Sequence, residues 1–263
     1  MNRYFLFTLL WLFNNGAALA LDLQWPPQMQ QLCKKAQEEK FSPSPASLKS
    51  PHPEKLFNLI EMGGGYDEVA KEIGEKTPDK IILQGVTPMM MATLTGNWPA
   101  ASALISKGAD VNFKQPPEIT TTPLELSIFS RKFIFACKLI ENGAKIPRNK
   151  NDRQALLRDS LITLPSEMED GAIFVDFLIR NGLNVNDMGS TLETPLMRAV
   201  GVGSIPAIQV LLSHGARLDI AKHNGLTVWD IAKKKNNPQV IDLLMAAQKK
   251  QNSTGGKSGE IQK

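Results

Sequence analysis

Residues 85–112 read GVTPMMMATLTGNWPAASALISKGADVN and contain a spacing that the chain uses more than once. The stretch opens with Thr87-Pro88, and Gly108 lies 21 positions after Thr87. The same spacing separates two further Thr-Pro pairs from a Gly-Ala pair, namely Thr122-Pro123 from Gly143 and Thr194-Pro195 from Gly215. An internal repeat determines the whole architecture, because each copy is one supersecondary unit that stacks on the next.

The positions between these markers have the pattern of two packed helices. The residue five positions after each threonine is small, as is needed where two helices approach closely, and the residues three and four before each glycine are apolar. Such a helix pair buries only one side by itself and has to stack on its neighbours. The small residues are Ala92, Ser127, Ala199 and Ala232, and the apolar pairs are at 104–105, 139–140, 178–179 and 211–212.

These residues resemble the ankyrin repeat, whose pattern is roughly G-x-T-P-L-H-x-A-A, a glycine turn, a V-x-x-L-L helix and G-A-D-V-N. The matches lie at 85–88, 108–112, 194–196 and 225–227, and the resemblance covers about residues 54–247. It implies an all-α ankyrin-repeat solenoid of about five to six helix–loop–helix units with β-hairpin-like fingers at one edge. The repeat-defining residues are Thr87, Pro88, Gly108, Thr122, Pro123, Gly143, Gly182, Thr194, Pro195, Gly215, Gly225 and Thr227.

The departures from the pattern are also informative. The family's histidine after Thr-Pro-Leu is missing, so we expect lower local stability in the turns; Met90, Glu125, Met197 and Asp230 stand in its place. The third repeat, around residues 151–186, lacks Thr-Pro, and its Gly182 lies 39 positions after Gly143 instead of 33. We place these six extra residues in the stretch 163–170, between the two helices of that repeat.

Both ends of the chain differ from the repeats. Residues 1–20 have a basic start at Arg3, an apolar run and a small-x-small ending, which is typical of a secretory signal peptide cut after Ala20. An uncleaved anchor or a short core helix is the alternative. Cleavage implies a periplasmic or secreted protein with no membrane insertion afterwards. We expect an N-terminal helix and a proline-rich connector over 21–53, the ankyrin-repeat domain over 54–247, and a disordered tail over 248–263.

The charge distribution argues against a nucleic-acid partner. The formal net charge is +4, of which Arg3 supplies +1 and residues 231–263 supply +5, so residues 21–230 carry −2. A nucleic-acid-binding domain concentrates positive charge on its folded surface. Here the positive charge belongs to the C-terminal end, where lysines serve to solvate the end of a repeat array.

The two cysteines suggest one disulfide, because exported proteins oxidise their thiols. Cys33 lies on the apolar face of the expected N-terminal helix, together with Met29 and Leu32. Cys137 occupies a repeat position that is otherwise polar, so we expect it to face outward. We therefore predict that the N-terminal helix docks on the repeats and that Cys33 and Cys137 join the two. Two unpaired thiols are the alternative.

No motif in the sequence has the pattern of a catalytic, cofactor-binding or metal-binding site. The histidines at 52, 214 and 223 share no metal spacing, and no Cys-x-x-Cys occurs. The glycines at 63–65 lack the Lys-Ser/Thr of a phosphate loop. We predict that the protein is not an enzyme and needs no cofactor or metal; an unrecognised active site is the alternative.

The candidate partner-binding residues lie in the expected fingers. An exposed apolar residue at a finger tip has no role in the turn itself, which favours Phe113 and Met188, whereas Asp and Asn also suit tight turns. The full set is Asp110, Asn112, Phe113, Lys114, Asn186, Met188, Lys222 and His223.

The resemblance also indicates the kind of function. It implies a protein–protein interaction module, monomeric alone, that binds an effector enzyme or a periplasmic enzyme. One hypothesis is an immunity or inhibitor protein that neutralises a toxic effector. The alternative is an accessory factor that supports a periplasmic enzyme or peroxide defence.

Overall fold

The computed structural model describes residues 23–38, 55–83, 85–114, 121–161, 168–188 and 192–255. The expected signal peptide, the proline-rich connector and the last eight residues, 256–263, lie outside these ranges. The chain divides into two compact units, and each is described by itself. Unit 1 comprises residues 27–146, and unit 2 comprises residues 24–26 and 147 onward.

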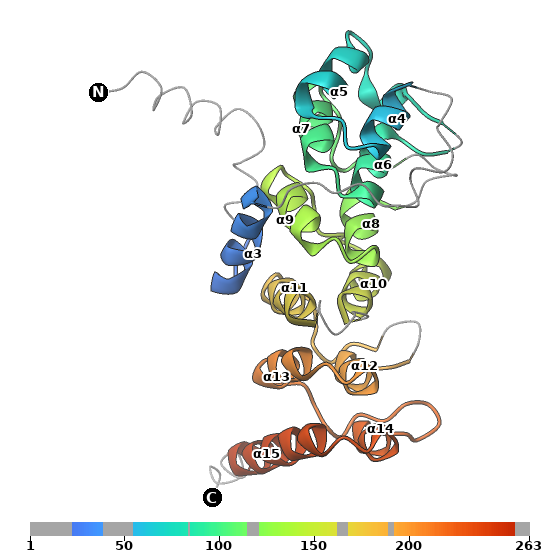
Figure 1. Cartoon of the computed structure of the whole chain (residues 1–263). Coiled ribbons are helices and arrows are strands. Elements are labelled where there is room, and N and C mark those ends of the chain that lie inside the picture. The colour runs from blue at the N-terminus through green and yellow to red at the C-terminus, as the bar shows by residue number, and fades with distance from the viewer. Residues whose placement is uncertain are drawn as a thin grey trace, which may run out of the picture. The chain divides into compact units, whose positions relative to one another are not determined.

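Unit 1 consists of helix α3 and three helix–loop–helix pairs (Figure 1). Helix α3 (Pro27–Glu38) precedes the pairs, and a 3-10 turn, η2 (Pro78–Lys80), follows the first of them. The pairs are α4 (Lys55–Glu61) with α5 (Tyr66–Ile73), α6 (Pro88–Thr95) with α7 (Trp98–Ser106), and α8 (Pro123–Phe129) with α9 (Phe133–Glu141).

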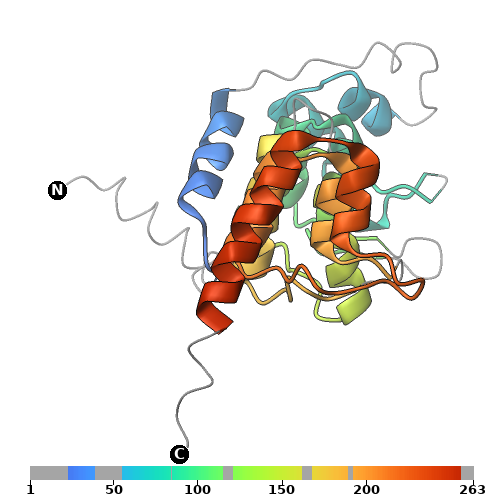
Figure 2. The ribbon, with the colours of Figure 1, turned by 90° about the horizontal axis from the view of Figure 1, so that it is seen from below.

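Unit 2 has three more pairs of the same kind, and its last pair, α14 with α15, lies side by side in Figure 2. The described part of the chain therefore holds six helix pairs, and the predicted all-α solenoid is confirmed. The pairs are α10 (Lys150–Leu161) with α11 (Met168–Arg180), α12 (Pro195–Val202) with α13 (Ile205–Ser213), and α14 (Val228–Lys235) with α15 (Pro238–Gly255).

Successive pairs pack first helix on first helix. In unit 1 α6 contacts both α4 and α8, and in unit 2 α12 contacts both α10 and α14. The small residues predicted at the close approach are fully buried, with exposed fractions of 0–1% for Ala92, Ser127, Ala199 and Ala232. We call these helices the first-helix row of each unit. Two isolated bridges, Leu83 with Val86 and Ala221 with Thr227, give two of the loops the predicted hairpin character.

The Thr-Pro pairs start the first helices. The hydroxyl oxygens of Thr87, Thr122 and Thr194 each accept a hydrogen bond from the backbone N–H three residues later, at 3.2 Å. The proline that follows fits the first helical turn, where its missing N–H costs nothing. The repeat glycines end the second helices with φ of 80–91° at Gly108, Gly143, Gly182 and Gly215. Only glycine adopts this backbone conformation without strain.

Acidic residues replace the missing histidine in two turns. A Glu125 carboxylate oxygen accepts from the backbone N–H of Thr122 at 2.6 Å and from its hydroxyl at 3.0 Å. Asp230 accepts from the same two groups of Thr227, at 2.8 and 2.7 Å. The bond from the Thr227 backbone N–H is the main reason why the pKa of Asp230 is below its ordinary value. These turns are therefore bonded locally in spite of the lost histidine.

Asn97 joins one helix pair to the next. Its side chain is fully buried, and its Oδ1 caps α7 by accepting from the backbone N–H of Ala100 at 3.0 Å. Its Nδ2 donates to the carbonyl oxygens of Ile60, in the last turn of α4, and of Gly64, between α4 and α5, at 3.0 and 3.1 Å. One amide thus satisfies buried backbone groups of two pairs at once.

The predicted position of the extra residues in the third repeat lies largely outside the described ranges. The expected site was 163–170, but α11 begins at Met168, and residues 162–167 lie outside the described ranges. Its helices are long, with 12 and 13 residues against 8 and 9 in α12 and α13. Asn149, which accepts from Asp152 N–H at 2.8 Å, takes the capping role of threonine only six positions after Gly143. The loop between Gly143 and Asn149 is thus shorter than the corresponding loops of the other repeats, and helices α10 and α11 are longer than α12 and α13.

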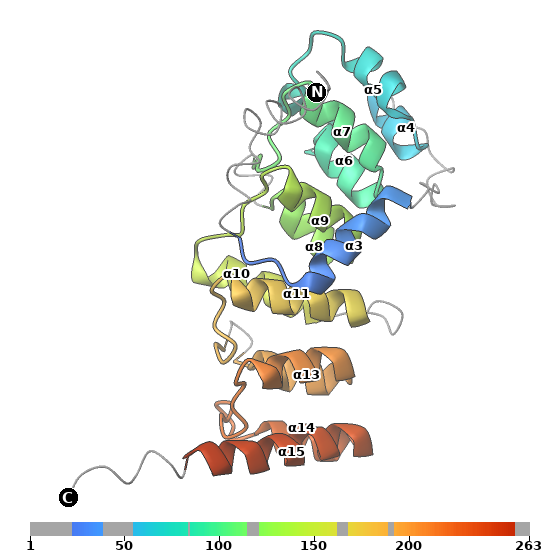
Figure 3. The same cartoon turned by 90° about the vertical axis from the view of Figure 1, so that its left-hand side faces the viewer.

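The two ends of the repeat region are also occupied by helix. Helix α3 packs on α9 as predicted, which Figure 3 shows from the side on which α3 crosses it. The prediction of disorder from residue 248 is wrong for 248–255, because α15 continues to Gly255. Gln251 explains the extension: its Nε2 donates to the carbonyl oxygen of Ala216 at 2.9 Å and so attaches the last turns to the preceding repeat.

The substitution Asn97→Ala should lower the free energy of unfolding by about 2–4 kcal/mol, because it removes a helix cap and the side-chain donor to two buried carbonyl groups. Ser204→Ala is the matched control: Ser204 is equally buried and caps α13 alone, by accepting from Ala207 N–H. It should cost about 1 kcal/mol. Urea unfolding of both variants measures the difference, and equal costs would contradict the bridging role of Asn97.

The substitution Asp230→Asn should remove a pH-dependent part of the stability. Since the pKa of Asp230 is lowered in the folded state, its contribution is complete above the ordinary carboxyl pKa of about 3.9 and is lost as the pH falls through the folded-state value. The wild type should therefore have the higher Tm at pH 7, and the difference should shrink below about pH 4. Asp242→Asn, at an exposed position on α15, is the control. A difference in Tm that does not change with pH would refute this role.

Candidate functional site

The first-helix row of unit 1 carries an apolar surface. The residue seven positions after each capping threonine is Leu94 on α6 and Phe129 on α8, with exposed fractions of 45% and 69%. The residues four positions after the threonine, Met91 and Leu126, are half-buried. Because α6 and α8 pack on each other, these equivalent positions repeat along one side of the row. We call Met91, Leu94, Leu126 and Phe129 the apolar face.

The equivalent positions of unit 2 have a different character. Four and seven residues after the capping threonines, α12 has Arg198 and Gly201, and α14 has Ile231 and Lys234. Arg198 Nη1 lies 3.6 Å from a carboxylate oxygen of Glu193. At the seventh position a partner would therefore meet a glycine and a lysine in unit 2, where unit 1 offers the large apolar side chains of Leu94 and Phe129.

Two of the predicted finger residues hold successive repeats together. Asn112 donates from Nδ2 to the carbonyl oxygen of Gly143 at 3.1 Å and accepts from Lys145 N–H at 2.8 Å. Asn186 makes the same pair of bonds one unit later, to Gly215 at 3.3 Å and from Arg217 at 2.8 Å. Since both ends of each amide are engaged, these asparagines have a structural role in joining successive repeats.

The other finger candidates differ in their exposure and in the bonds that they make. Phe113 and Met188 are half-buried, so the expectation that they are exposed tips is wrong. The side chain of Asp110 accepts from Asn112 N–H at 2.8 Å. Lys114 pairs with Glu125 at 3.2 Å, Lys222 pairs with Glu193, and His223 is exposed.

The burial of Phe113 and Met188 depends on the residues that pack around each finger, which the local sequence does not reveal. Leu94 and Phe129 were missed as candidates. Their signal was an apolar residue repeated at the seventh position after the capping threonine.

His214 takes part in a pair between repeats. Its Nε2 lies 2.5 Å from Asp176 Oδ1, and Arg180 Nε also bonds the Asp176 carboxylate, at 3.0 Å from each oxygen. A carboxylate shared by a histidine and an arginine one helical turn away is held in place, which is typical of a structural ion pair.

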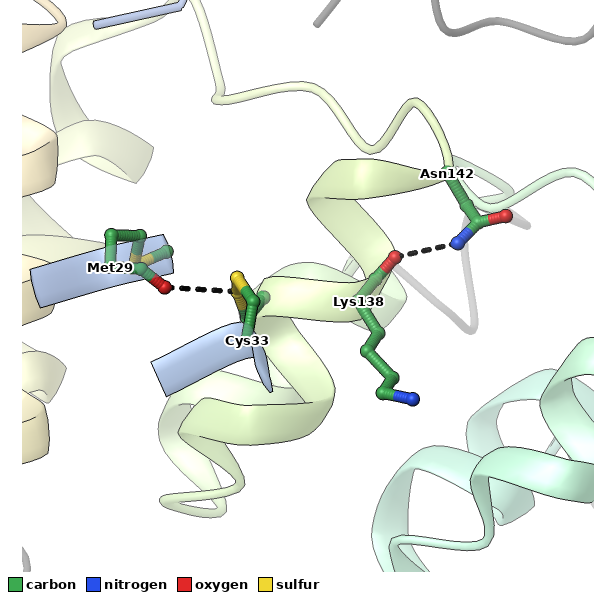
Figure 4. The surroundings of a disulfide bond; sticks show 5 residues. Met29, Cys33, Lys138 and Asn142 are labelled. Carbon is green, nitrogen blue, oxygen red and sulfur yellow. Dashed lines mark hydrogen bonds between the residues drawn. A yellow bond between two sulfur atoms is a disulfide. The ribbon is translucent and has the colours of Figure 1, made fainter. Parts of the chain in front are cut away.

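The two cysteines meet where α3 packs on α9 (Figure 4). Their Cα atoms are 5.5 Å apart, and the carbonyl oxygen of Met29 lies 3.8 Å from Cys137 Sγ. Cys137 is fully buried, so the expectation that it faces solvent is corrected: helix α3 covers that position. Cys33 is 4% exposed, as its place on the apolar side of α3 predicted.

Glu141 adds a carboxylate to this pair of sulfur atoms. It lies one helical turn after Cys137 on α9, and the two sulfur atoms and a carboxylate oxygen of Glu141 all lie within 4.8 Å of one another. Partial burial raises the pKa of Glu141, and partial burial lowers the pKa of Lys138. The Lys138 ammonium lies over the ring of Trp98, 5.1 Å from its centre. Within the described residues, Cys33, Cys137 and Glu141 are the group whose ligand atoms lie close enough together to share a metal ion.

In the part of the chain that the structure describes, no helix combines the length and the apolar character needed to cross a bilayer.

Relatives of this chain contain ankyrin repeats. It is 31% identical over 163 residues to a putative ankyrin repeat protein of fowlpox virus, covering 60% of this chain and 46% of the relative. It is 25% identical over 171 residues to the putative ankyrin repeat protein YahD of Escherichia coli, covering 62% and 81%. The chain thus spans about half the length of the viral relative and most of the bacterial one.

Solved structures share the fold. A chain in the complex of the Bd0816 predatory endopeptidase of Bdellovibrio bacteriovorus with immunity protein Bd3460 matches with a TM-score of 0.56 and 21% identity, over 75% of this chain and 99% of that one. The human ASB11 ankyrin repeat domain matches with a TM-score of 0.56 and 17% identity, over 84% and 97%.

The family models agree with the repeats found in the sequence. Residues 84–115 match the model of the ankyrin repeat, and residues 168–254 match the model of three consecutive ankyrin repeats. The first match contains Thr87-Pro88 and Gly108, and the second contains Thr194-Pro195 and Gly215. With the six helix pairs, the capping threonines and these matches in agreement, the chain is an ankyrin-repeat protein.

Proposed function

We propose that this protein is a non-catalytic binding module whose protein partner docks on the apolar face of unit 1. The observation that carries the proposal is the exposure of Phe129, at 69%, and of Leu94, at 45%, at equivalent positions of adjacent helices. Ankyrin repeats mediate protein–protein interactions, and their domains are generally non-enzymatic. The exposed residues therefore support the apolar face as the surface of such an interaction.

Physical chemistry supports this choice of surface. Leaving large apolar side chains in water has an unfavourable free energy of about 25 cal/mol per Å² of apolar area, which a partner recovers by covering them. Aromatic residues and methionine are enriched at the centres of protein interfaces, and a few such anchors supply most of the binding energy. Phe129 has the exposure and chemistry of an anchor, and Leu94, Met91 and Leu126 would contact the partner around it.

We further propose that the partner is an enzyme that this protein inhibits, outside the cytoplasm. One structural neighbour belongs to a complex of an endopeptidase with an immunity protein, which supports an enzyme as the partner. The signal-peptide pattern of residues 1–20 supports export, and export would bring the protein into the compartment where secreted or delivered enzymes act.

Export also supports a disulfide between Cys33 and Cys137. The Cα separation of 5.5 Å is in the usual range for a disulfide, and the two sulfur atoms face each other across the contact of α3 with α9. The bond would close a loop with a sequence separation of 104 residues and would hold α3 on unit 1.

The disulfide predicts that protein isolated from an oxidising compartment has no thiol that reacts with an alkylating reagent after unfolding. The variant Cys137→Ser should lower the free energy of unfolding by about 2–5 kcal/mol, because it frees a long loop. Mass spectrometry of alkylated protein and urea unfolding give the two readouts. The reduced wild type should match the variant in stability, and two reactive thiols in the exported wild type would refute the bond.

The binding proposal predicts that a tagged full-length chain retains a soluble enzyme from periplasmic extract or from effector-secreting cells. Phe129→Asp and Leu94→Asp should each weaken this complex at least tenfold, which corresponds to about 1.4 kcal/mol. Met245→Asp is the matched control, because Met245 is 53% exposed but belongs to α15 of unit 2 and is not part of the apolar face. Circular dichroism should confirm that all three variants are folded.

The activity of the retained enzyme then separates the functions. If the protein is an inhibitor, one equivalent of the wild type should abolish the activity of the enzyme. One equivalent of the Phe129→Asp variant should leave most of that activity. Retention that both face variants leave unchanged would disprove the proposed surface. A retained enzyme that keeps its full activity would disprove the inhibitor role and favour an accessory one.

A further inference from the structure

The centre formed by Cys33, Cys137 and Glu141 has chemistry that a binding module does not require. Two sulfur atoms and one carboxylate come together from two helices, α3 and α9, within 4.8 Å of one another. The other repeats have Ser102, Asp176, Gln209 and Asp242 at the position of Cys137, so the repeat pattern itself does not call for a cysteine there.

The donor set matches the preference of a thiophilic divalent cation. Zn²⁺ binds cysteine thiolates and carboxylate oxygens, and a site with three protein ligands leaves one position for water. Cys137 and Glu141 are one helical turn apart on α9, so both side chains leave the same face of the helix. Cys33 approaches that face from α3, as Figure 4 shows.

We infer that Cys33, Cys137 and Glu141 form a binding site for a divalent cation such as Zn²⁺, which is open when the cysteines are reduced and closed when they form a disulfide. This inference is independent of the proposed binding of a partner enzyme. The same pair of cysteines thus holds α3 on α9 in either of two ways, by a covalent bond or through a metal ion.

The two states exclude each other because a disulfide sulfur has no thiolate to donate. A dithiol reductant attacks one sulfur, the bond between Cys33 and Cys137 breaks, and two electrons and two protons pass to the pair while the reductant becomes a disulfide. Zinc binding then releases the two thiol protons, since only thiolates are ligands. Glu141, which is only partly buried, gives the ion a route from solvent to the buried sulfur atoms.

The environment helps to balance the charge of the loaded site. Two thiolates and one carboxylate around Zn²⁺ leave a net charge of −1. Lys138, next to Cys137 on α9, lies close enough to Glu141 for its positive charge to act on that carboxylate. Its ammonium group is placed over the ring of Trp98, 5.1 Å from its centre.

The test is a zinc titration of the full chain, reduced with a phosphine under anaerobic conditions, with the metal alone as the probe. The reduced wild type should bind one equivalent, and the oxidised wild type none. Cys33→Ser and Cys137→Ser should lose stoichiometric binding. Glu141→Gln should weaken binding by at least about tenfold, the loss typical even for a metal site's outer partners. Glu75→Gln, at an exposed position in unit 1, is the matched control and should bind as the wild type does.

A second measurement identifies the ligands. Cobalt(II) bound to the reduced wild type should give a thiolate-to-metal charge-transfer band in the near ultraviolet that both cysteine variants lack. No stoichiometric zinc in the reduced wild type would overturn the inference, as would equal binding by the wild type and the cysteine variants. Circular dichroism of the variants excludes unfolding as the cause of a lost signal.

Discussion

The close approach of neighbouring first helices is the constraint on which the structure depends. A large side chain at the position five residues after the capping residue would separate the helices. The residues at this position are small and buried, namely Ala92, Ser127, Ala199 and Ala232. Because each helix pair buries its second side only against a neighbour, this spacing determines whether a continuous core forms. The caps, the glycine turns and the bridging asparagines all act to keep successive pairs at that distance.

The repeat architecture could be predicted from the sequence because its causes are local. A threonine that caps a helix, a proline in the first turn and a glycine with positive φ act within a few residues of their own position, as at Thr87, Pro88 and Gly108. Their fixed spacing then shows how often the unit recurs. The docking of α3 was also predictable, because Met29, Leu32 and Cys33 share one face that needs a partner.

The remaining features depend on what packs against a residue. The third repeat has a net excess of six residues. This total does not show that α10 and α11 are longer than the helices of other repeats while the loop between Gly143 and Asn149 is shorter. Cys137 is buried because a helix more than one hundred residues away in sequence covers it. Phe113 and Met188 are half-buried and Phe129 is exposed, although all three have apolar side chains. The candidate binding surface could therefore be found only from the structure.

The pairing of α3 with α9 has a consequence for the order in which the chain folds. Chains are synthesised from the N-terminus, and each helix pair needs only the pair beside it. Helix α3, in contrast, has to wait for α9, across a separation of 104 residues between Cys33 and Cys137. During that interval the apolar side of α3 is uncovered and Cys33 is a free thiol. A chaperone or thiol oxidoreductase that acts on this protein would meet residues 27–38 first.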